Sequence, residues 1–450
     1  DSKIGIFSDS KSFDGTENYK HNWRRPINYE LFETNGEESK LNQLCEARVT
    51  GGASRGCALK SMGLYANKRF GEKRFNYEFF PDQRQGITDF KSVMMRNAGN
   101  DFDYLYMRDA VIQRIMAENV DIDWQAWRPA IFFLNGQYKG ILNIRERSNE
   151  DNIYTNYDGL EDIDMVENWY ELKEGDYDEW KAFMDFYQAH GHSYEEYDKI
   201  MDVSEFMNVM ILNLFFCNLD FPGNNIVWWK PQAEGGRWRV IVKDTDFGLG
   251  LYGRSVSYNT IKWLYDPNYD KDNAWANRYE HTRLFRRLME DERFSREFID
   301  RCAIYMGDFM NLDRTWEIWE PMYNLIRNEY PIHRKLYNEW WPNYNTELSN
   351  AKTWLKNRPA IFYKHISDYY KVGTPVNLSI NQSLSSADLS RIEVSFNGVK
   401  LTRSKFDGKF FAGRSVVLTG ENVVGWRVCE TTSSGELKTR DVEGSTLTLT

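Results

Sequence analysis

The sequence lacks the features of a membrane-spanning or zinc-binding protein. It contains no run of 18 apolar residues, so it predicts no transmembrane helix. Its five cysteines, at positions 45, 57, 217, 302 and 429, show no C-x-x-C spacing, and its six histidines form no H-E-x-x-H array. A structural zinc site is therefore not expected, and the odd number of cysteines leaves at least one thiol unpaired.

Positive charge is scarce relative to negative charge. The chain has 57 Lys and Arg residues against 67 Asp and Glu residues, which gives a net charge of −10 and a pI of about 5.4. Binding to a phosphate backbone needs clustered Lys and Arg, so a nucleic-acid partner is not expected. Asp1 is not preceded by a basic-then-apolar leader or a lipobox cysteine, and we expect that such a leader has been removed.

The chain is long enough for several domains. At 450 residues it exceeds the size at which a single core keeps growing, so two or more domains are expected. Its composition changes after Tyr370. Residues 376–450 contain short alternating apolar runs with glycine turns between them, a pattern that predicts a small all-β sandwich of the immunoglobulin-like type.

Strands, a hairpin and one helix are expected in the first third of the chain. Residues 43–66 predict two strands around the glycine-rich turn 51–56, and residues 90–96 predict a further strand. Apolar residues three or four positions apart predict a helix over residues 103–118. Asn135-Gly136 between two apolar runs is typical of a hairpin.

The middle of the chain is expected to be mainly helical. Residues 149–200 predict polar surface helices, and Ser204 is expected to cap the apolar helix that follows. Two strands at 226–230 and 238–242 come next, and residues 280–370 predict further helices.

Two acidic motifs stand on either side of this last strand pair. The first is Asn218-Leu-Asp220-Phe-Pro-Gly-Asn-Asn225, and the second is Asp244-Thr-Asp246-Phe-Gly. Asp220 and Asn225 have the spacing of the Asp and Asn in a kinase catalytic loop, and the second motif contains D-F-G, whose Asp holds metal in kinases. Asp and Asn also cap ordinary turns, so it is the order of the motifs among the strands and helices that favours a kinase-type site.

Four segments resemble the CotH kinase family, whose members are spore-coat kinases and secreted bacterial relatives with an atypical protein-kinase fold. They are GGASRGCALKS (51–61), VMMRNAGND (93–101), FLNGQYKGILNIRER (133–147) and NLDFPGNNIVWWK…RWRVIVKDTDFGLG (218–250). The likeness covers about residues 25–370. The C-terminal segment resembles, more loosely, the β-sandwich modules appended to secreted proteins of Bacteroidetes-type bacteria.

The resemblance implies an α+β architecture: a bilobal, kinase-like fold followed by the sandwich. We expect a lead-in and an N-lobe over residues 1–147, a helical C-lobe over 148–372, and the immunoglobulin-like module over 373–450. It also implies an extracellular or cell-envelope location.

The resemblance further implies catalytic and metal-binding roles for residues of the two acidic motifs. Asp220 would orient or deprotonate the acceptor hydroxyl, and Asp246 would be the second catalytic residue. Asn225, Asp244 and Asp246 would supply hard oxygen ligands to Mg²⁺ or Mn²⁺.

Nucleotide-binding residues are expected at Gly51, Gly52, Lys60, Arg96 and Glu146. The two glycines would offer backbone N–H groups to the phosphates of ATP. Lys60 or Arg96 would grip phosphate, and Asp109 or Glu118 in the following helix would pair with Arg96. Glu146 lies at the end of the strand that would lead to the adenine-contacting segment.

The sequence thus favours a secreted, ATP- and metal-dependent kinase that phosphorylates Ser or Thr of a protein or another hydroxyl substrate. Asn-Leu-Asp replaces the usual His-Arg-Asp triplet before the catalytic loop. An alternative is therefore an inactive, kinase-like surface or adhesion protein that recognises a glycan or a protein.

Overall fold

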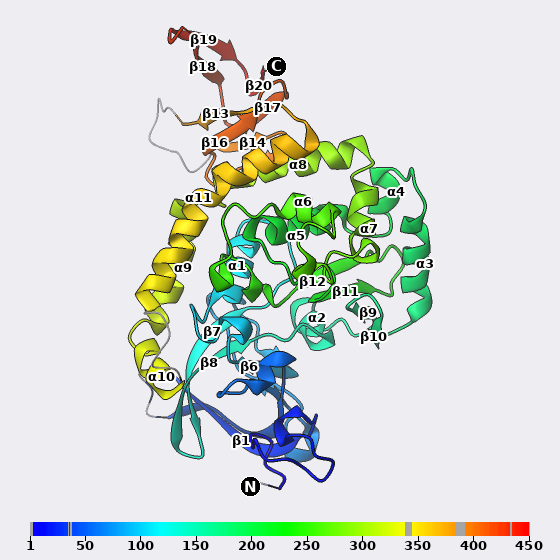
Figure 1. Ribbon diagram of the computed structural model, residues 1–450, viewed down its shortest axis with the longest axis vertical. Coiled ribbons are helices and arrows are strands. Elements are labelled where there is room, and N and C mark those ends of the chain that lie inside the picture. Colours follow the sequence, from blue (N-terminus) through cyan, green and yellow to red (C-terminus); the bar gives the residue numbers. More distant parts are fainter. Residues whose placement is uncertain are drawn as a thin grey trace.

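Helices and sheets alternate along the molecule, as the computed structural model of residues 3–34, 36, 38–337, 344–382, 392–432 and 434–449 shows. An N-terminal sheet lies at one end, the C-terminal strands lie at the other, and most helices lie between them (Figure 1). This mixture agrees with the predicted α+β class. No helix among the described residues is long and apolar enough to cross a lipid bilayer.

The N-terminal sheet has six antiparallel strands in the order β1-β2-β3-β6-β8-β7. They are β1 (Arg25–Phe32), β2 (Ser39–Val49), β3 (Met62–Tyr65), β6 (Ser92–Arg96), β7 (Trp127–Leu134) and β8 (Gln137–Arg145), beside the short pair β4 (Phe75–Asn76) and β5 (Asp89–Phe90). Asn135 and Gly136 have φ angles of 51° and 75°, as a two-residue hairpin requires, which confirms the predicted hairpin. Strand β1 was not predicted.

The first long helix, α1 (Arg108–Ala117), begins later than the residue 103 predicted from its periodicity. The carboxylate of Asp101 accepts the backbone N–H groups of Leu105 (3.0 Å) and Arg108 (2.9 Å). These bonds hold the preceding residues in turns, because a side chain that accepts local N–H groups competes with helical bonding.

The second sheet contains two strands that the sequence did not predict. Its order is β10-β9-β11-β12, and its strands are β9 (Ile163–Glu167), β10 (Glu171–Glu174), β11 (Ile226–Pro231) and β12 (Arg239–Val242). The prediction of helices alone over 149–200 is therefore wrong, although α2 (Glu150–Asn156), α3 (Tyr177–Gln188) and α4 (Tyr194–Asp198) do lie there. Helix α5 (Val203–Phe216) is capped by Asp202, which accepts the Glu205 N–H at 3.0 Å, and not by Ser204.

The remaining helices confirm the helical prediction for residues 280–370. Within the described part of this range they are α7 (Tyr279–Leu288), α8 (Glu292–Asp308), α9 (Leu312–Ile326), α10 (Tyr330–Tyr337) and α11 (Tyr344–Tyr370), while α6 (Thr260–Tyr265) precedes it and was not predicted. Helix α5 contacts α1, α4, α6 and α8, and all but one of its residues are buried. Helix α5 therefore passes through the core and ends at the first acidic motif.

The C-terminal strands form small antiparallel sheets that pack on α8 (Figure 1). They are β13 (Pro375–Ile380), β14 (Glu393–Phe396), β15 (Val399–Lys400), β16 (Phe406–Phe411), β17 (Val416–Glu421), β18 (Gly425–Thr431), β19 (Leu437–Glu443) and β20 (Thr446–Leu449). Asp300 of α8 accepts bonds from Arg414 (2.6 Å) and Asn397 (2.9 Å). Gly307 leaves room for the Phe406 ring, since a Cβ there would overlap it.

Helix α10 is joined to β8 by a buried histidine. The Nδ1 atom of His333 accepts the backbone N–H of Ile141 at 3.1 Å, and the side chain is 1% exposed. Burial, with a smaller contribution from Arg334, lowers the pKa of His333 to about 3. The native protein therefore holds this imidazole neutral.

We expect the stability of the protein to fall as the pH drops below 6.5, partly because of His333. The unfolded chain takes up a proton near pH 6.5, whereas the native state does not until about pH 3, so this histidine alone should cost about 2 kcal/mol at pH 5 relative to pH 8. His333→Asn keeps an acceptor for Ile141 and removes the titration. Urea unfolding at several pH values should show a shallower decline in the variant; equal slopes would contradict the prediction.

Candidate functional site

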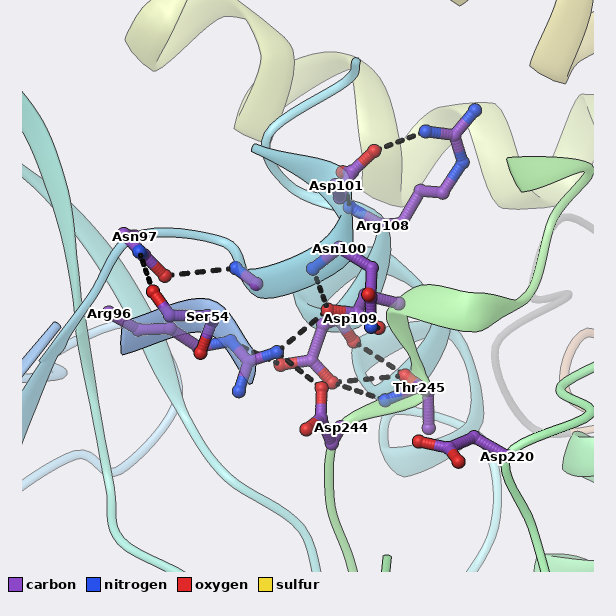
Figure 2. Close-up of polar contacts among 12 residues, drawn as sticks. Ser54, Arg96, Asn97, Asn100, Asp101, Arg108, Asp109, Asp220, Asp244 and Thr245 are labelled. Carbon is purple, nitrogen blue, oxygen red and sulfur yellow. Dashed lines mark hydrogen bonds and ion pairs between the residues drawn. The ribbon is translucent and has the colours of Figure 1, made fainter. Parts of the chain in front are cut away.

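The candidate site lies where turns after two strands meet helix α1. Arg96 ends β6, and Asp244 and Asp246 follow β12 in and beside the short helical turn η5 (Thr245–Phe247). The Nη2 atom of Arg96 contacts the Oδ2 atom of Asp246 at 2.9 Å and also contacts Asp244. One guanidinium thus joins both aspartates of the second acidic motif (Figure 2).

Helix α1 contributes a third carboxylate to the site. Asp109 lies 3.8 Å from Arg96 and 2.7 Å from Arg145. Its Oδ1 accepts the Thr245 N–H at 2.8 Å (Figure 2). Burial alone would raise the pKa of Asp109, but the guanidinium groups of Arg145 and Arg96 lower it to about 2. Asp109 is therefore ionised and fixes both arginines. Glu118, the other predicted partner of Arg96, pairs with Arg114 instead.

Asp246 is the most enclosed acidic group of the site. Its side chain is 1% exposed, and its Oδ2 and Oδ1 atoms accept the backbone N–H (2.9 Å) and the side-chain amide (3.1 Å) of Asn100. Burial and the neighbouring Asp244 raise the pKa of Asp246 well above its usual range, although Arg96 opposes them. The three carboxylates of Asp109, Asp244 and Asp246 thus outnumber the two arginines that contact them.

The first acidic motif places Asp220 near Asp244. The side-chain amides of Asn225 (2.5 Å) and Asn224 (3.3 Å) donate to the Oδ2 atom of Asp220. Burial and then Asp244 raise the pKa of Asp220 to about 6. A carboxylate with a pKa near 6 is suited to accept a proton at neutral pH, because a general base works best when its pKa lies close to the working pH.

The glycine-rich turn approaches the site through Asn97. The amide of Asn97 donates to the carbonyl of Ser54 in the turn η2 (Ala53–Gly56) at 3.2 Å. Gly51 has a φ of 107°, which disfavours any other residue, and a Cβ there would overlap the Ser54 hydroxyl. Residues 52–56 also spell Gly-x-Ser-x-Gly, but this turn joins two strands, whereas the nucleophile elbow of a serine hydrolase joins a strand to a helix.

Lys60 and Glu146 have partners outside this cluster. Lys60 lies 3.0 Å from Asp9 and over the ring of Tyr19 at 4.2 Å, so the N-terminal segment holds it. Glu146 accepts bonds from Arg84 (3.0 Å), the backbone N–H of Ala126 (2.8 Å) and Asn156 (2.8 Å). Of the two predicted phosphate-gripping cations, Arg96 is the one in contact with Asp244 and Asp246, and the nucleotide roles of Lys60 and Glu146 remain predictions.

A family comparison covers this whole arrangement. The model of the CotH kinase protein family matches residues 47–362, which is more than two thirds of the chain. The chain belongs to the CotH kinase protein family. The CotH match includes every predicted site residue and ends before the C-terminal strands begin at Pro375. A search of curated proteins found no match to this chain.

The chemistry of the CotH site fits a hard divalent cation such as Mg²⁺ or Mn²⁺. The available donors are carboxylate and amide oxygens, which are the ligands these ions prefer. Burial and the neighbouring Asp244 raise the pKa values of Asp220 and Asp246, and a bound cation would stabilise the ionised form of both. Within the described ranges no three His, Cys, Asp or Glu side chains are grouped closely enough to hold a metal ion by themselves. A bound ion would therefore also need oxygen ligands from Asn225 or from the substrate.

Three polar residues of the CotH site were not singled out in the sequence as site residues. Arg145 contacts Asp109, Asn97 contacts the glycine-rich turn, and Asn100 contacts Asp246. Asn97 and Asn100 lie in the segment VMMRNAGND that carries the family resemblance, but no spacing rule assigns a function to them. Only the fold brings this segment against Asp246.

Proposed function

We propose that this protein is an ATP- and metal-dependent kinase that transfers a phosphoryl group to Ser or Thr of a protein or to another hydroxyl substrate. Membership of the CotH kinase family supports a kinase-like function. The observation that carries the proposal is that Asp220, with a pKa of about 6, lies close to Asp244 beside the Arg96–Asp246 pair. Positioning and charge neutralisation are the main requirements of phosphoryl transfer.

Each residue of this group has a distinct role in the proposed reaction. Asp220 orients the acceptor hydroxyl and takes its proton, while the amides of Asn224 and Asn225 hold the carboxylate in place. Asp246, with Asp244 and Asn225, holds the metal ion, and Arg96 supplies positive charge next to them. When bound, the ion offsets negative charge on the phosphates of ATP.

The proposal extends to the architecture and the location. Residues 1–147, which include the six-stranded sheet, would form the lead-in and N-lobe, and residues 148–372, which include helices α2 to α11, would form the C-lobe (Figure 1). Residues 373–450 would be an immunoglobulin-like module, and Gly51 and Gly52 would cover the phosphates. We propose that the protein acts outside the cell or in the cell envelope.

Titration calorimetry of the whole chain with ATP tests the proposal, with Mg²⁺, with Mn²⁺ and with a chelator. We expect binding that requires the divalent cation, and transfer of radiolabelled phosphate from ATP to dephosphorylated casein. Absence of binding under all three conditions, in protein shown to be folded by circular dichroism, would overturn the proposal. Binding without transfer to casein or to the chain itself would favour the inactive, kinase-like binding protein.

A further inference from the structure

Asn100 donates two hydrogen bonds to Asp246, one from its backbone and one from its side chain. It lies in the turn η4 (Gly99–Asp101), directly after β6, and donates to both carboxylate oxygens of Asp246. Its backbone N–H takes Oδ2 at 2.9 Å and its side-chain amide takes Oδ1 at 3.1 Å. A carboxylate held by one residue at both oxygens has a fixed plane as well as a fixed position.

These bonds determine which acceptor position of the Asp246 carboxylate stays open among the described residues. A carboxylate has about four acceptor positions, two on each oxygen. Among the described residues, Arg96 (2.9 Å) and the Asn100 N–H occupy Oδ2, and the Asn100 amide occupies one position on Oδ1. Gly99 closes the Oδ2 side further, since a Cβ on Gly99 would overlap that atom. The remaining acceptor position is on Oδ1.

The turn that carries Asn100 is itself rigidly held. Asn97 is fully buried, and its side chain donates to the carbonyls of Ser54 (3.2 Å) and Leu59 (2.7 Å). Its Oδ1 accepts the Ser61 hydroxyl at 2.8 Å and the Gly99 N–H at 3.1 Å. The glycine-rich turn and Asp246 are therefore positioned by two asparagines of one short segment (Figure 2).

We propose that Asn100 is a positioning residue that aims the Oδ1 lone pair of Asp246 at the metal ion. The inference rests on the proposed function, because it assigns an orienting partner to the metal-binding carboxylate named there. Partners that orient a ligating carboxylate change metal affinity by about 10- to 100-fold when they are removed. The backbone N–H remains in any Asn100 variant, so the carboxylate keeps its place and loses only its second restraint.

The experiment compares Asn100→Ala and Asn100→Leu with the wild type. Leu approximates the size of Asn without its amide, so it covers the case in which Ala disturbs folding. Asn119→Ala is the matched control, because the Asn119 amide donates to the Ile115 carbonyl at 2.7 Å at the end of α1. The measurement is Mn²⁺ affinity by calorimetry in the presence of a saturating non-hydrolysable ATP analogue, beside the metal-free thermal unfolding midpoint.

We expect both Asn100 variants to bind Mn²⁺ about 10- to 100-fold more weakly, with unfolding midpoints close to that of the wild type and of Asn119→Ala. Wild-type Mn²⁺ affinity in either folded variant would overturn the inference and leave the proposed function standing. Failure of the wild type itself to bind Mn²⁺ with the analogue would overturn both. A purely structural role would instead lower the unfolding midpoint and leave the Mn²⁺ affinity of the folded protein unchanged.

Discussion

Asp246→Asn should abolish metal-dependent nucleotide binding while leaving the protein at least as stable as the wild type. The substitution keeps the shape of the side chain and removes a charge that burial and Asp244 disfavour, as the raised pKa of Asp246 shows. Arg96 keeps its contacts with Asp244 and Asp109. The charge of Asp246 lowers the stability of the metal-free protein but is needed for metal binding. Its removal should therefore weaken metal binding without lowering stability.

Calorimetry with ATP and Mn²⁺ measures the first effect, and urea unfolding without metal measures the second. We expect nucleotide affinity in the presence of Mn²⁺ to fall at least about 100-fold, because losing a metal ligand should weaken binding more than losing a residue that only orients a ligand. Asp441→Asn is the matched control, because Asp441 pairs with Arg427 in the exposed ribbon of β18 and β19. Wild-type affinity in a folded Asp246→Asn variant would remove Asp246 from the metal site.

Arg358→Met should cause the largest loss of stability expected of a single substitution in this protein, about 3–5 kcal/mol. Arg358 of α11 is fully buried, and its guanidinium donates to the carbonyls of Leu214 (3.0 Å) and Phe215 (2.8 Å) in the last turn of α5. It also donates to the carbonyls of Val256 and Tyr258, both at 2.8 Å. Met fills much of the same volume but leaves these buried acceptors without their donor.

The consequence should reach the candidate site, because α5 ends at Phe216, four residues before Asp220. Without Arg358 the last carbonyls of α5 lose the donor that satisfies them, and the first acidic motif loses its support. Urea unfolding measures the stability, with Arg427→Met on the exposed ribbon as the control, for which we expect little change because exposed ion pairs contribute little to stability. A loss below about 1 kcal/mol for Arg358→Met would contradict the prediction.

Local rules explain which elements the sequence could predict. The Asn135-Gly136 hairpin, the strands on either side of the glycine-rich turn and the helices after residue 280 depend on turn chemistry and periodicity, and they are confirmed. Strand β9 was missed because its pairing partner β11 is about 60 residues away, and β10, which pairs only with β9, has every residue exposed. The start of α1 was missed because the Asp101 side chain takes over backbone N–H groups that periodicity assigns to a helix.

The candidate site divides in the same way. The sequence predicts the two acidic motifs, because each follows a core helix or strand whose end determines where the motif lies. Their residues are Asp220, Asn225, Asp244 and Asp246. The sequence does not decide between Arg96 and Lys60, because both are cations near the end of a strand. Only the packing of η5 against α1 brings Asp246 to Arg96.

By itself the sequence determined the family, the α+β composition and the acidic motifs, because short-range spacing and turn chemistry suffice for them. The tertiary structure alone decided that Asn100 holds both oxygens of Asp246, that Arg145 and Arg96 share Asp109, and that Arg358 closes the end of α5. Each of these contacts joins residues far apart in the chain. Their geometry depends on how the whole core packs, and a local pattern carries no information about it.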